Sequence, residues 1–362
     1  MNTTFNTPTE PTLSGDPTVW IGVETGRPGL RAQLSPWGAS WLRCEVRWPS
    51  GECRQVLLPP RSARLGPAQP RSFMGSTIGR YANRIAHGQV EHQGQHWTLN
   101  RTPGERHQLH GGPGGWDTAC WSATQHSARH VTYTHISPDG DQGYPGAAHA
   151  ETHYRLLDAW TLELAWRVTV TRASPVCLSN HVYFNLDPRH PVHGSCTDVR
   201  HHRLQLAATQ YAPVDAELIP LGPLAPVAST SLDFRKPHRL LDRWLQDEQQ
   251  RHGAGYDHAF LLDTPGLPDQ SAPPAAQLTS ADGRLTLHLH TTQPALQLYT
   301  GQYLAGLPAP QQQVYGACQG LALEPQWLPD SPHHPEWPQP PVWLQPGQVW
   351  QHSAVYRFEP SD

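Results

Sequence analysis

The sequence predicts an all-β protein, built as one large antiparallel β domain with few and short helices. Two observations support this fold class. Several segments alternate apolar and polar residues with a period of two, and clusters of turn-forming residues separate these segments. The chain of 362 residues also contains 38 prolines and 30 glycines, which suit many short strands joined by turns better than long helices.

The clearest predicted strand covers residues 160–170. Its even positions are apolar and its odd positions are mostly polar, so one face is expected to be buried and the other to meet solvent. Residues 285–290 and 296–299 alternate in the same way. In the last of these segments, Gln297 and Tyr299 are expected on the solvent face.

The remaining segments define the expected organisation of the chain. One short helix is expected near residues 240–250, and the proline-rich segment 264–278 is expected to form a surface loop. Residues 1–17, rich in Thr, Pro and Asn, predict a disordered leader. No internal repeat or break in composition divides residues 18–362, which are therefore expected to form a single domain.

Charge and hydropathy exclude several classes of partner. The N-terminal segment has neither the basic residues nor the apolar run of a signal peptide. No segment approaches the roughly 18 consecutive apolar residues that span a bilayer. The net charge of −4 gives no positive field that would attract nucleic acid or an anionic membrane. These features predict a cytoplasmic location, with neither nucleic acid nor membrane as a partner.

The lysine and cysteine content limits the covalent chemistry. Lys236 is the single lysine, and its polar neighbours favour a solvated surface charge, so a Schiff-base mechanism is not expected. The six cysteines show no CxxC spacing. Cys44 and Cys53 flank a turn and could face each other across a hairpin, but the reduced state is expected in a chain without an export signal.

Histidines and glycines offer further motifs that are weak on their own. His288 and His290 would share one strand face, yet no third ligand follows at a suitable spacing, so solvent-facing histidines and no metal site are expected. The glycine run at residues 111–115 matches no phosphate-binding motif and predicts a flexible or close-packed loop.

Five other segments combine polar functional groups with strand-like or turn-like neighbours. Each alone has a structural explanation, such as a hydrogen-bonding hub, a capped turn or a surface charge. They read GRYANRI at 79–85, HQLHGG at 107–112, LSNHVYFNL at 178–186, GYDH at 255–258 and LEPQWLPD at 323–330.

Taken together and in this order, these segments resemble the aldose 1-epimerase (galactose mutarotase) family, over roughly residues 20–358. The resemblance implies a large antiparallel β-sandwich, the galactose mutarotase-like supersandwich, with a shallow sugar-binding cleft. It also implies no cofactor, a small-molecule aldose as substrate, and interconversion of the α and β anomers of a free hexose such as galactose or glucose.

The resemblance assigns roles to particular residues. Glu324 matches the catalytic base of the family and His181 its catalytic acid. Tyr183, in the same motif as His181, is a further candidate for the cleft. Five residues match those that hold the sugar hydroxyls and the ring oxygen: Asn83, Arg84, His110, Asp257 and Gln297.

One departure from the family lies beside the expected base. The family usually reads Glu-Thr-Gln where this chain has Glu324-Pro325-Gln326. Proline fixes φ near about −65° and removes a backbone donor. This change can re-aim Glu324 slightly, but it leaves the carboxylate in place.

The expected reaction explains why a carboxylate and an imidazole are needed. A base removes the proton of the anomeric hydroxyl while an acid protonates the ring oxygen, and the open aldehyde then recloses on its other face. Histidine exchanges protons at its ordinary pKa of about 6.5, whereas glutamate starts near about 4.3 and gains basicity by burial. Neither a metal nor a covalent intermediate is required.

Three alternatives remain open at this stage. A glycoside hydrolase or lyase would use Asp257 and Glu324 as a carboxylate pair. A lectin-like β-sandwich would bind sugar without catalysis. A related enzyme acting on hexose 6-phosphates would need cationic side chains in the cleft beyond Arg84.

Overall fold

The computed structural model describes residues 18–62, 71–187, 197–266 and 273–361. The expected disordered leader, residues 1–17, lies outside this part. Strands supply most of the regular structure, and α1 (Glu248–His252) is the single α-helix among the described residues. No helix within them is both long and apolar enough to cross a membrane.

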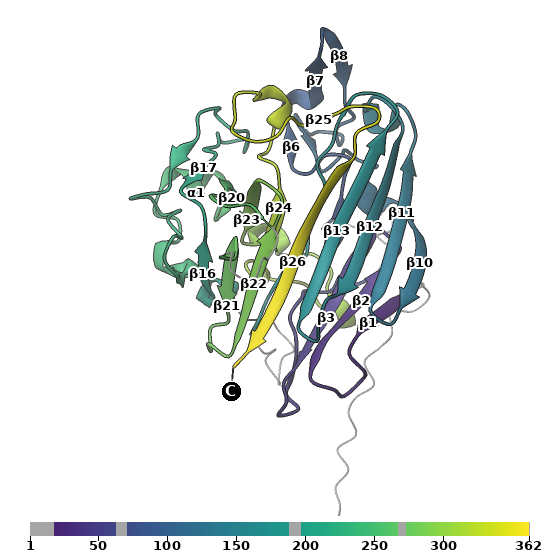
Figure 1. Ribbon diagram of the computed structural model, residues 1–362. Coiled ribbons are helices and arrows are strands. Elements are labelled where there is room, and N and C mark those ends of the chain that lie inside the picture. Colours follow the sequence, from purple (N-terminus) through teal and green to yellow (C-terminus); the bar gives the residue numbers. More distant parts are fainter. Residues whose placement is uncertain (1–17, 63–70, 188–196, 267–272, 362) are drawn as a thin grey trace, which may run out of the picture.

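A nine-stranded antiparallel sheet forms one face of the molecule (Figure 1). The C-terminal strand β26 lies near its middle and pairs with β13 on one side and β22 on the other. In spatial order the strands are β10 (Ser122–Ser127), β11 (His130–Ser137), β12 (Ala148–Leu156), β13 (Thr161–Val170), β26 (Trp350–Pro360), β22 (Leu285–Thr291), β21 (Ala276–Thr279), β16 (Arg203–Leu206) and β19 (His238–Arg239).

Two smaller sheets lie behind this face (Figure 1). The first is four-stranded, with β1 (Val19–Gly22), β2 (Gly29–Ser35), β3 (Ser40–Arg47) and β4 (Cys53–Gln55). The second is five-stranded, in the order β18 (Ala225–Pro226), β17 (Gln210–Tyr211), β20 (Asp257–Leu261), β23 (Ala295–Tyr299) and β24 (Ala322–Gln326).

Four short pairings complete the set of strands. One of them carries residues of the candidate site described below, and a second leads directly into His181. The pairs are β5 (Thr77–Ile78) with β15 (Ser179–Asn180), β6 (Arg84–Ile85) with β9 (Gln108–Leu109), β7 (Gln89–His92) with β8 (Gln95–Thr98), and β14 (Ser174–Pro175) with β25 (Trp343–Leu344).

Aromatic side chains hold the sheets together. Trp41 of β3 meets Tyr356 of β26 edge to face, with ring centroids 5.4 Å apart. Such pairs contribute about 0.5–1.5 kcal/mol beyond the burial of their area. Tyr154 of β12 adds a polar contact by donating its hydroxyl to the carbonyl of Ala39 at 2.7 Å. The core that these residues belong to runs from Ile21 to Phe358.

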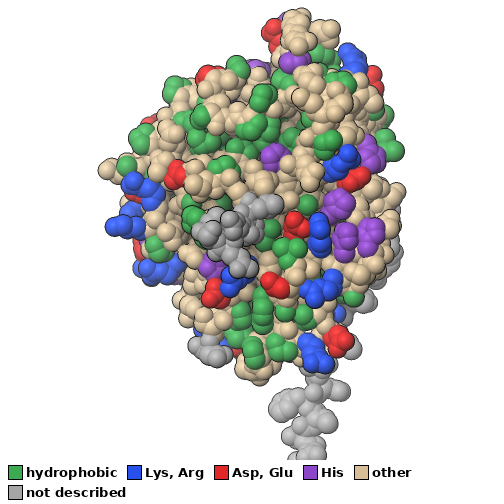
Figure 2. All heavy atoms as spheres, in the orientation of Figure 1, with side chains coloured by type: hydrophobic (Ala, Val, Ile, Leu, Met, Phe, Trp, Pro, Cys, Tyr) green, Lys and Arg blue, Asp and Glu red, His purple; other side chains and the backbone are tan. Residues whose placement is uncertain are grey.

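The outer face of the large sheet carries charges of both signs together with several histidines (Figure 2). Glu151 pairs with His153 and Arg167, and Arg155 pairs with Glu163. Because acidic and basic groups are interspersed, this face presents no field of one sign.

The predicted alternation is confirmed for β13 and β22 and is wrong for β23. In β22 all three leucines are fully buried, and His288 and His290 lie half-buried on the other face. All five residues of β23 are buried, Gln297 and Tyr299 included. Strand β23 lies between β20 and β24, and both of its faces are covered by other parts of the protein. The face that carries Tyr299 lies against the candidate site.

Three local expectations can also be compared with the structure. The helix expected near residues 240–250 is split into a 3-10 turn, Leu240–Arg243, and the helix α1. The expected loop 264–278 is wrong for its last three residues, because they belong to β21; residues 267–272 lie outside the described part. Cys53 stands opposite Arg47 in the β3–β4 ladder, so it does not face Cys44.

The glycine run at residues 111–115 is a close-packed loop. Gly111 has φ of 81°, and a Cβ atom there would lie 2.0 Å from the carbonyl oxygen of Gly79. Only glycine allows this approach of the two backbones.

Candidate functional site

A cleft of about 180 Å³ gathers residues that lie far apart in the sequence. Seven of the eight predicted site residues line it. The lining consists of Arg71, Ser72, Phe73, Asn83, Arg84, Leu109, His110, His181, Tyr183, Asp257, Tyr299, Tyr303, Leu304, Leu307 and Glu324. Gln297, the eighth, lies outside the lining.

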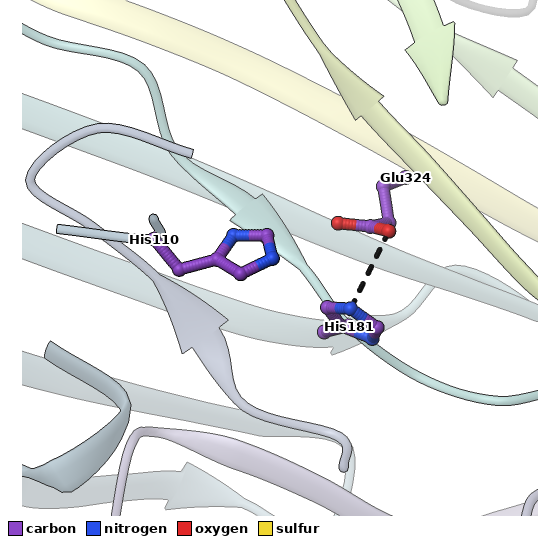
Figure 3. A group of neighbouring side chains, drawn as sticks. All are labelled: His110, His181 and Glu324. Carbon is purple, nitrogen blue, oxygen red and sulfur yellow. Dashed lines mark ion pairs between the residues drawn. The ribbon is translucent and has the colours of Figure 1, made fainter. Parts of the chain in front are cut away.

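His181 and Glu324 face each other in this cleft (Figure 3). Glu324 lies in β24, and His181 directly follows β15, which packs against β24. The distance from His181 Nε2 to Glu324 Oε1 is 3.6 Å, and the two side chains are only 5% and 2% exposed. The fold therefore joins the two groups that the sequence predicts as acid and base.

Burial shifts the pKa of both groups toward their neutral forms. Loss of solvation raises the pKa of Glu324 well above its ordinary value; the charge of Asp257 raises it further and Arg84 opposes the shift. Burial lowers the pKa of His181 to about 4. Because a separated charge pair is disfavoured here, Glu324 and His181 are expected to titrate as one unit that holds a single proton near neutral pH.

Pro325 leaves the direction of Glu324 into the cleft intact. It lies in β24 opposite Leu296, and its carbonyl accepts a hydrogen bond from Gln293 Nε2 at 3.0 Å. Strand β24 is the last strand of the five-stranded sheet. An edge strand is a position that tolerates proline, because the ladder occupies only one of its sides.

Asp257, which is part-buried, and Gln297, which is buried, form a hydrogen-bonded pair on neighbouring strands. Gln297 Nε2 donates to Asp257 Oδ1 at 2.5 Å, and Gln297 is 3% exposed. Burial raises the pKa of Asp257, while Arg84 and the Gln297 hydrogen bond oppose the shift. Asp257 lines the cleft, and Gln297 lies outside the lining while hydrogen-bonded to its carboxylate.

Asn83 and His110 lock each other in place. The backbone N–H of His110 donates to the carbonyl of Asn83 at 3.0 Å, and the N–H of Asn83 donates to His110 Nδ1 at 3.1 Å. Burial, then the nearby charges of His181, Arg84 and Arg71, lowers the pKa of His110 well below its ordinary value. A neutral ring that accepts at Nδ1 carries its proton on Nε2, so His110 is a fixed hydrogen-bond donor.

Aromatic rings surround the imidazole of His181. Tyr183 lies 4.9 Å from it between ring centroids, and Phe73 stacks on it at 5.8 Å with an interplanar angle of 21°. Phe73 also lies 4.6 Å from the ring of His110. These apolar walls are one source of the desolvation that shifts the pKa of His181.

Arg71 brings a second guanidinium to the cleft, but three of its five N–H donors are already used. Its Nε donates to Asp117 Oδ2 at 2.7 Å, its Nη1 to the carbonyl of Gly112 at 2.7 Å, and its Nη2 to the other carboxylate oxygen of Asp117. Its charge is balanced by the buried carboxylate of Asp117 and lies over the ring of Phe73. Arg84 is therefore the cation in the cleft without such a partner carboxylate.

No sequence pattern points to several of the residues that line the cleft. Arg71, Ser72 and Phe73 belong to a segment without periodicity, and their place in the cleft depends on packing between distant loops. Tyr299 lies within the predicted alternation, which places it on the solvent face. A strand buried on both faces would have signalled it, but the short β23 segment alone does not reveal that burial.

One group of side chains has the spacing of a metal site. The potential ligand atoms of His110, His181 and Glu324 lie within 4.8 Å of one another (Figure 3). A metal ligand needs a free lone pair, and the lone pair of His110 at Nδ1 already accepts the Asn83 N–H. The donor set thus falls short of the three ligands that a stable protein site needs.

Known proteins resemble this chain along nearly its whole length. Residues 23–357 match the family described as aldose 1-epimerase. The chain is 43% identical over 330 residues to the aldose 1-epimerase of Escherichia coli K12, which covers 91% of this chain and 92% of that protein. It is 36% identical over 332 residues to human galactose mutarotase, with 91% of each chain covered.

Solved structures share the fold. An aldose epimerase homologue from C. elegans superposes with a TM-score of 0.81 at 25% identity, over 96% of this chain and 100% of that one. A galactose 1-epimerase from Lactobacillus acidophilus gives a TM-score of 0.77 at 25% identity with the same coverage.

Proposed function

The chain belongs to the aldose 1-epimerase family, and on that premise we propose that Glu324 and His181 interconvert the α and β anomers of a free hexose by general base and general acid catalysis. The enzyme is an isomerase. The observation that supports these roles is the 3.6 Å contact between the two groups in a buried cleft. A glycoside-processing enzyme and a non-catalytic sugar binder are both disfavoured by the relation to isomerases over most of the chain.

Each proton has a defined place in the proposed ring opening. The active pair carries its proton on His181, with Glu324 ionised. Glu324 takes the proton of the C1 hydroxyl, His181 gives its proton to O5, and the C1–O5 bond breaks to leave the open aldehyde. Glu324 is then protonated and His181 neutral, which is the arrangement that burial favours. Rotation about C1–C2 and reversal of both transfers yield the other anomer.

The other cleft residues provide recognition. Arg84 and His110 donate to sugar oxygens, and Asp257 accepts from sugar hydroxyls. Asn83 and Gln297 act through His110 and Asp257, to which they are hydrogen-bonded. Tyr183 adds an apolar wall beside His181. Carbohydrate binding, the organisation of residues 18–362 as a single domain and a cytoplasmic location are three further predictions.

Polarimetry of freshly dissolved α-galactose, α-glucose, α-xylose and α-arabinose tests the function. The protein is expected to accelerate the decay of optical rotation beyond the rate in buffer, in proportion to its concentration. A protein that binds these sugars without any acceleration would be a lectin, and the proposal would be rejected.

The charge of the cleft predicts a preference for neutral sugars. With its one shared proton the Glu324–His181 pair carries no net charge, the carboxylate of Asp257 balances Arg84, and Asp117 neutralises Arg71. We expect kcat/KM for galactose 6-phosphate to be lower than for galactose by roughly tenfold or more, since no cation in the cleft is left to compensate the lost solvation of a phosphate. Asp117→Asn, which releases Arg71, should narrow that gap. Equal kcat/KM values for the two sugars would contradict this account of the cleft.

The pKa shifts predict an unusual assignment of the pH profile. At acid pH a second proton binds to the pair and removes the base, so activity falls as pH drops through the pKa of His181, which burial lowers to about 4. At alkaline pH the pair loses its only proton and has no acid, so activity falls as pH rises through the pKa of Glu324, which burial raises. The alkaline limb of kcat/KM therefore belongs to the glutamate. After subtraction of the uncatalysed rate at each pH, a plateau that extends into alkali without a limb would contradict the shared proton.

A further inference from the structure

Asp330 lies in the segment that follows Glu324 and contacts the strand of Arg84. It lies six positions after Glu324, is 2% exposed, and adopts a left-handed backbone conformation with φ of 60°. Its N–H donates to the carbonyl of Arg84 at 2.8 Å, and its Oδ1 accepts from the N–H of Ala86 at 2.8 Å. Asp330 thus holds the backbone on both sides of Ile85.

The carboxylate of Asp330 is itself held from its other side. His333 Nδ1 lies 2.6 Å from Asp330 Oδ1, and the backbone N–H of His333 donates to the carbonyl of Asp330 at 2.9 Å. His334 Nε2 lies 3.8 Å from Oδ2. Both histidines line a neighbouring groove of about 450 Å³, so Asp330 connects the backbone of Arg84 and Ala86 to side chains of this groove.

The strand that presents Arg84 needs such support. Strand β6 has two residues, and its ladder to β9 consists of Arg84 with Leu109 and Ile85 with Gln108. A ladder this short leaves the backbone of Arg84 with few fixed contacts. Two hydrogen bonds from Asp330 tie it to the chain that continues from β24, the strand of Glu324.

We infer that Asp330 is a positioning residue that sets the distance between the sugar-binding Arg84 and the catalytic Glu324. It touches neither the cleft nor the reacting atoms, and it acts through the backbone of Arg84. Displacement of a binding group by about 1 Å can cost up to 10²-fold in rate. This inference rests on the proposed function, because it assumes that Arg84 binds the sugar.

Two substitutions of Asp330 test the inference. Asp330→Ala removes the acceptor for Ala86 and is expected to lower kcat/KM for galactose on the order of tenfold to 10²-fold, mainly through KM. Asp330→Asn keeps an acceptor oxygen of the same size but loses the charge that faces His333, so its effect should be smaller. If the alanine variant does not fold, the asparagine variant still reports the KM shift.

Asp187 provides a matched control. It is also buried, accepts a backbone N–H from the distant Ala281 at 2.7 Å and lies 3.9 Å from a histidine, His202, but it does not line the cleft. Asp187→Asn is expected to lower the melting temperature without raising KM. If the Asp330 and Asp187 variants lose stability alike and neither changes KM, Asp330 is merely structural and the inference is overturned.

A double-variant cycle separates this inference from the proposed function. If Asp330 acts through Arg84, Asp330→Asn should add little to the KM increase of Arg84→Ala. Fully additive effects would overturn the positioning role while leaving the epimerase function intact. Absence of catalysed mutarotation in the wild-type protein would instead reject the proposed function itself.

Discussion

Glu324→Gln is expected to lose catalysed mutarotation by about 10²–10⁴-fold, the usual contribution of a positioned acid–base group. Glutamine has nearly the same shape but cannot accept the proton of the anomeric hydroxyl. The residual rate with saturating galactose, compared at equal enzyme concentration, measures the loss. Glu217→Gln makes the same chemical change at an exposed site outside the cleft and should keep the full rate.

The same variant is expected to remain folded and to gain stability at alkaline pH. Burial raises the pKa of Glu324, so the folded protein holds this proton more tightly than the unfolded chain does. Its contribution to stability is present below the ordinary pKa of 4.5 and is lost as pH rises through the raised value. Gln carries no charge and avoids this loss. A melting temperature well below that of the wild type would show that Glu324 is needed for folding, and the rate loss would then say little about catalysis.

His181→Asn is expected to produce the second large loss, again about 10²–10⁴-fold in kcat. Asparagine can still donate a hydrogen bond toward the ring oxygen, but it cannot release a proton. The KM should change less than kcat, because the binding groups Arg84 and Asp257 are untouched. Rates measured over a range of galactose concentrations separate the two parameters.

Two other histidines serve as comparisons for that variant. His352→Asn changes a half-buried histidine of β26 outside the cleft, whose pKa burial also lowers to about 4, and it should leave the rate unchanged. His110→Gln removes a fixed donor and should raise KM more than it lowers kcat. An unaltered kcat in His181→Asn would remove this imidazole from the mechanism.

The strands were predictable where one face is buried and the other wet. The alternation in β13 and β22 gave both the element and its orientation. It failed in β23, because side chains on both faces of that strand are covered. The helix near residues 240–250 is broken because Asp247 accepts the N–H of Gln250 and caps the helix that begins at Glu248.

The resemblance of ordered motifs located the site far better than periodicity did. It identified seven lining residues, whereas Phe73 and Arg71 depend on contacts between distant loops. Even within one motif, the two arginines differ in role. Arg80 is 1% exposed and donates to the carbonyls of Pro145 and Gly146, and burial lowers its pKa to about 10. Only the three-dimensional structure distinguishes this internal brace from Arg84.

Magnetisation transfer between the anomeric protons of galactose at equilibrium measures the interconversion of the two anomers most directly. Saturating the α signal should diminish the β signal when the wild-type protein is present, and should leave it unchanged with Glu324→Gln or His181→Asn. Transfer of equal size in all three proteins would mean that the facing carboxylate and imidazole do not open the ring.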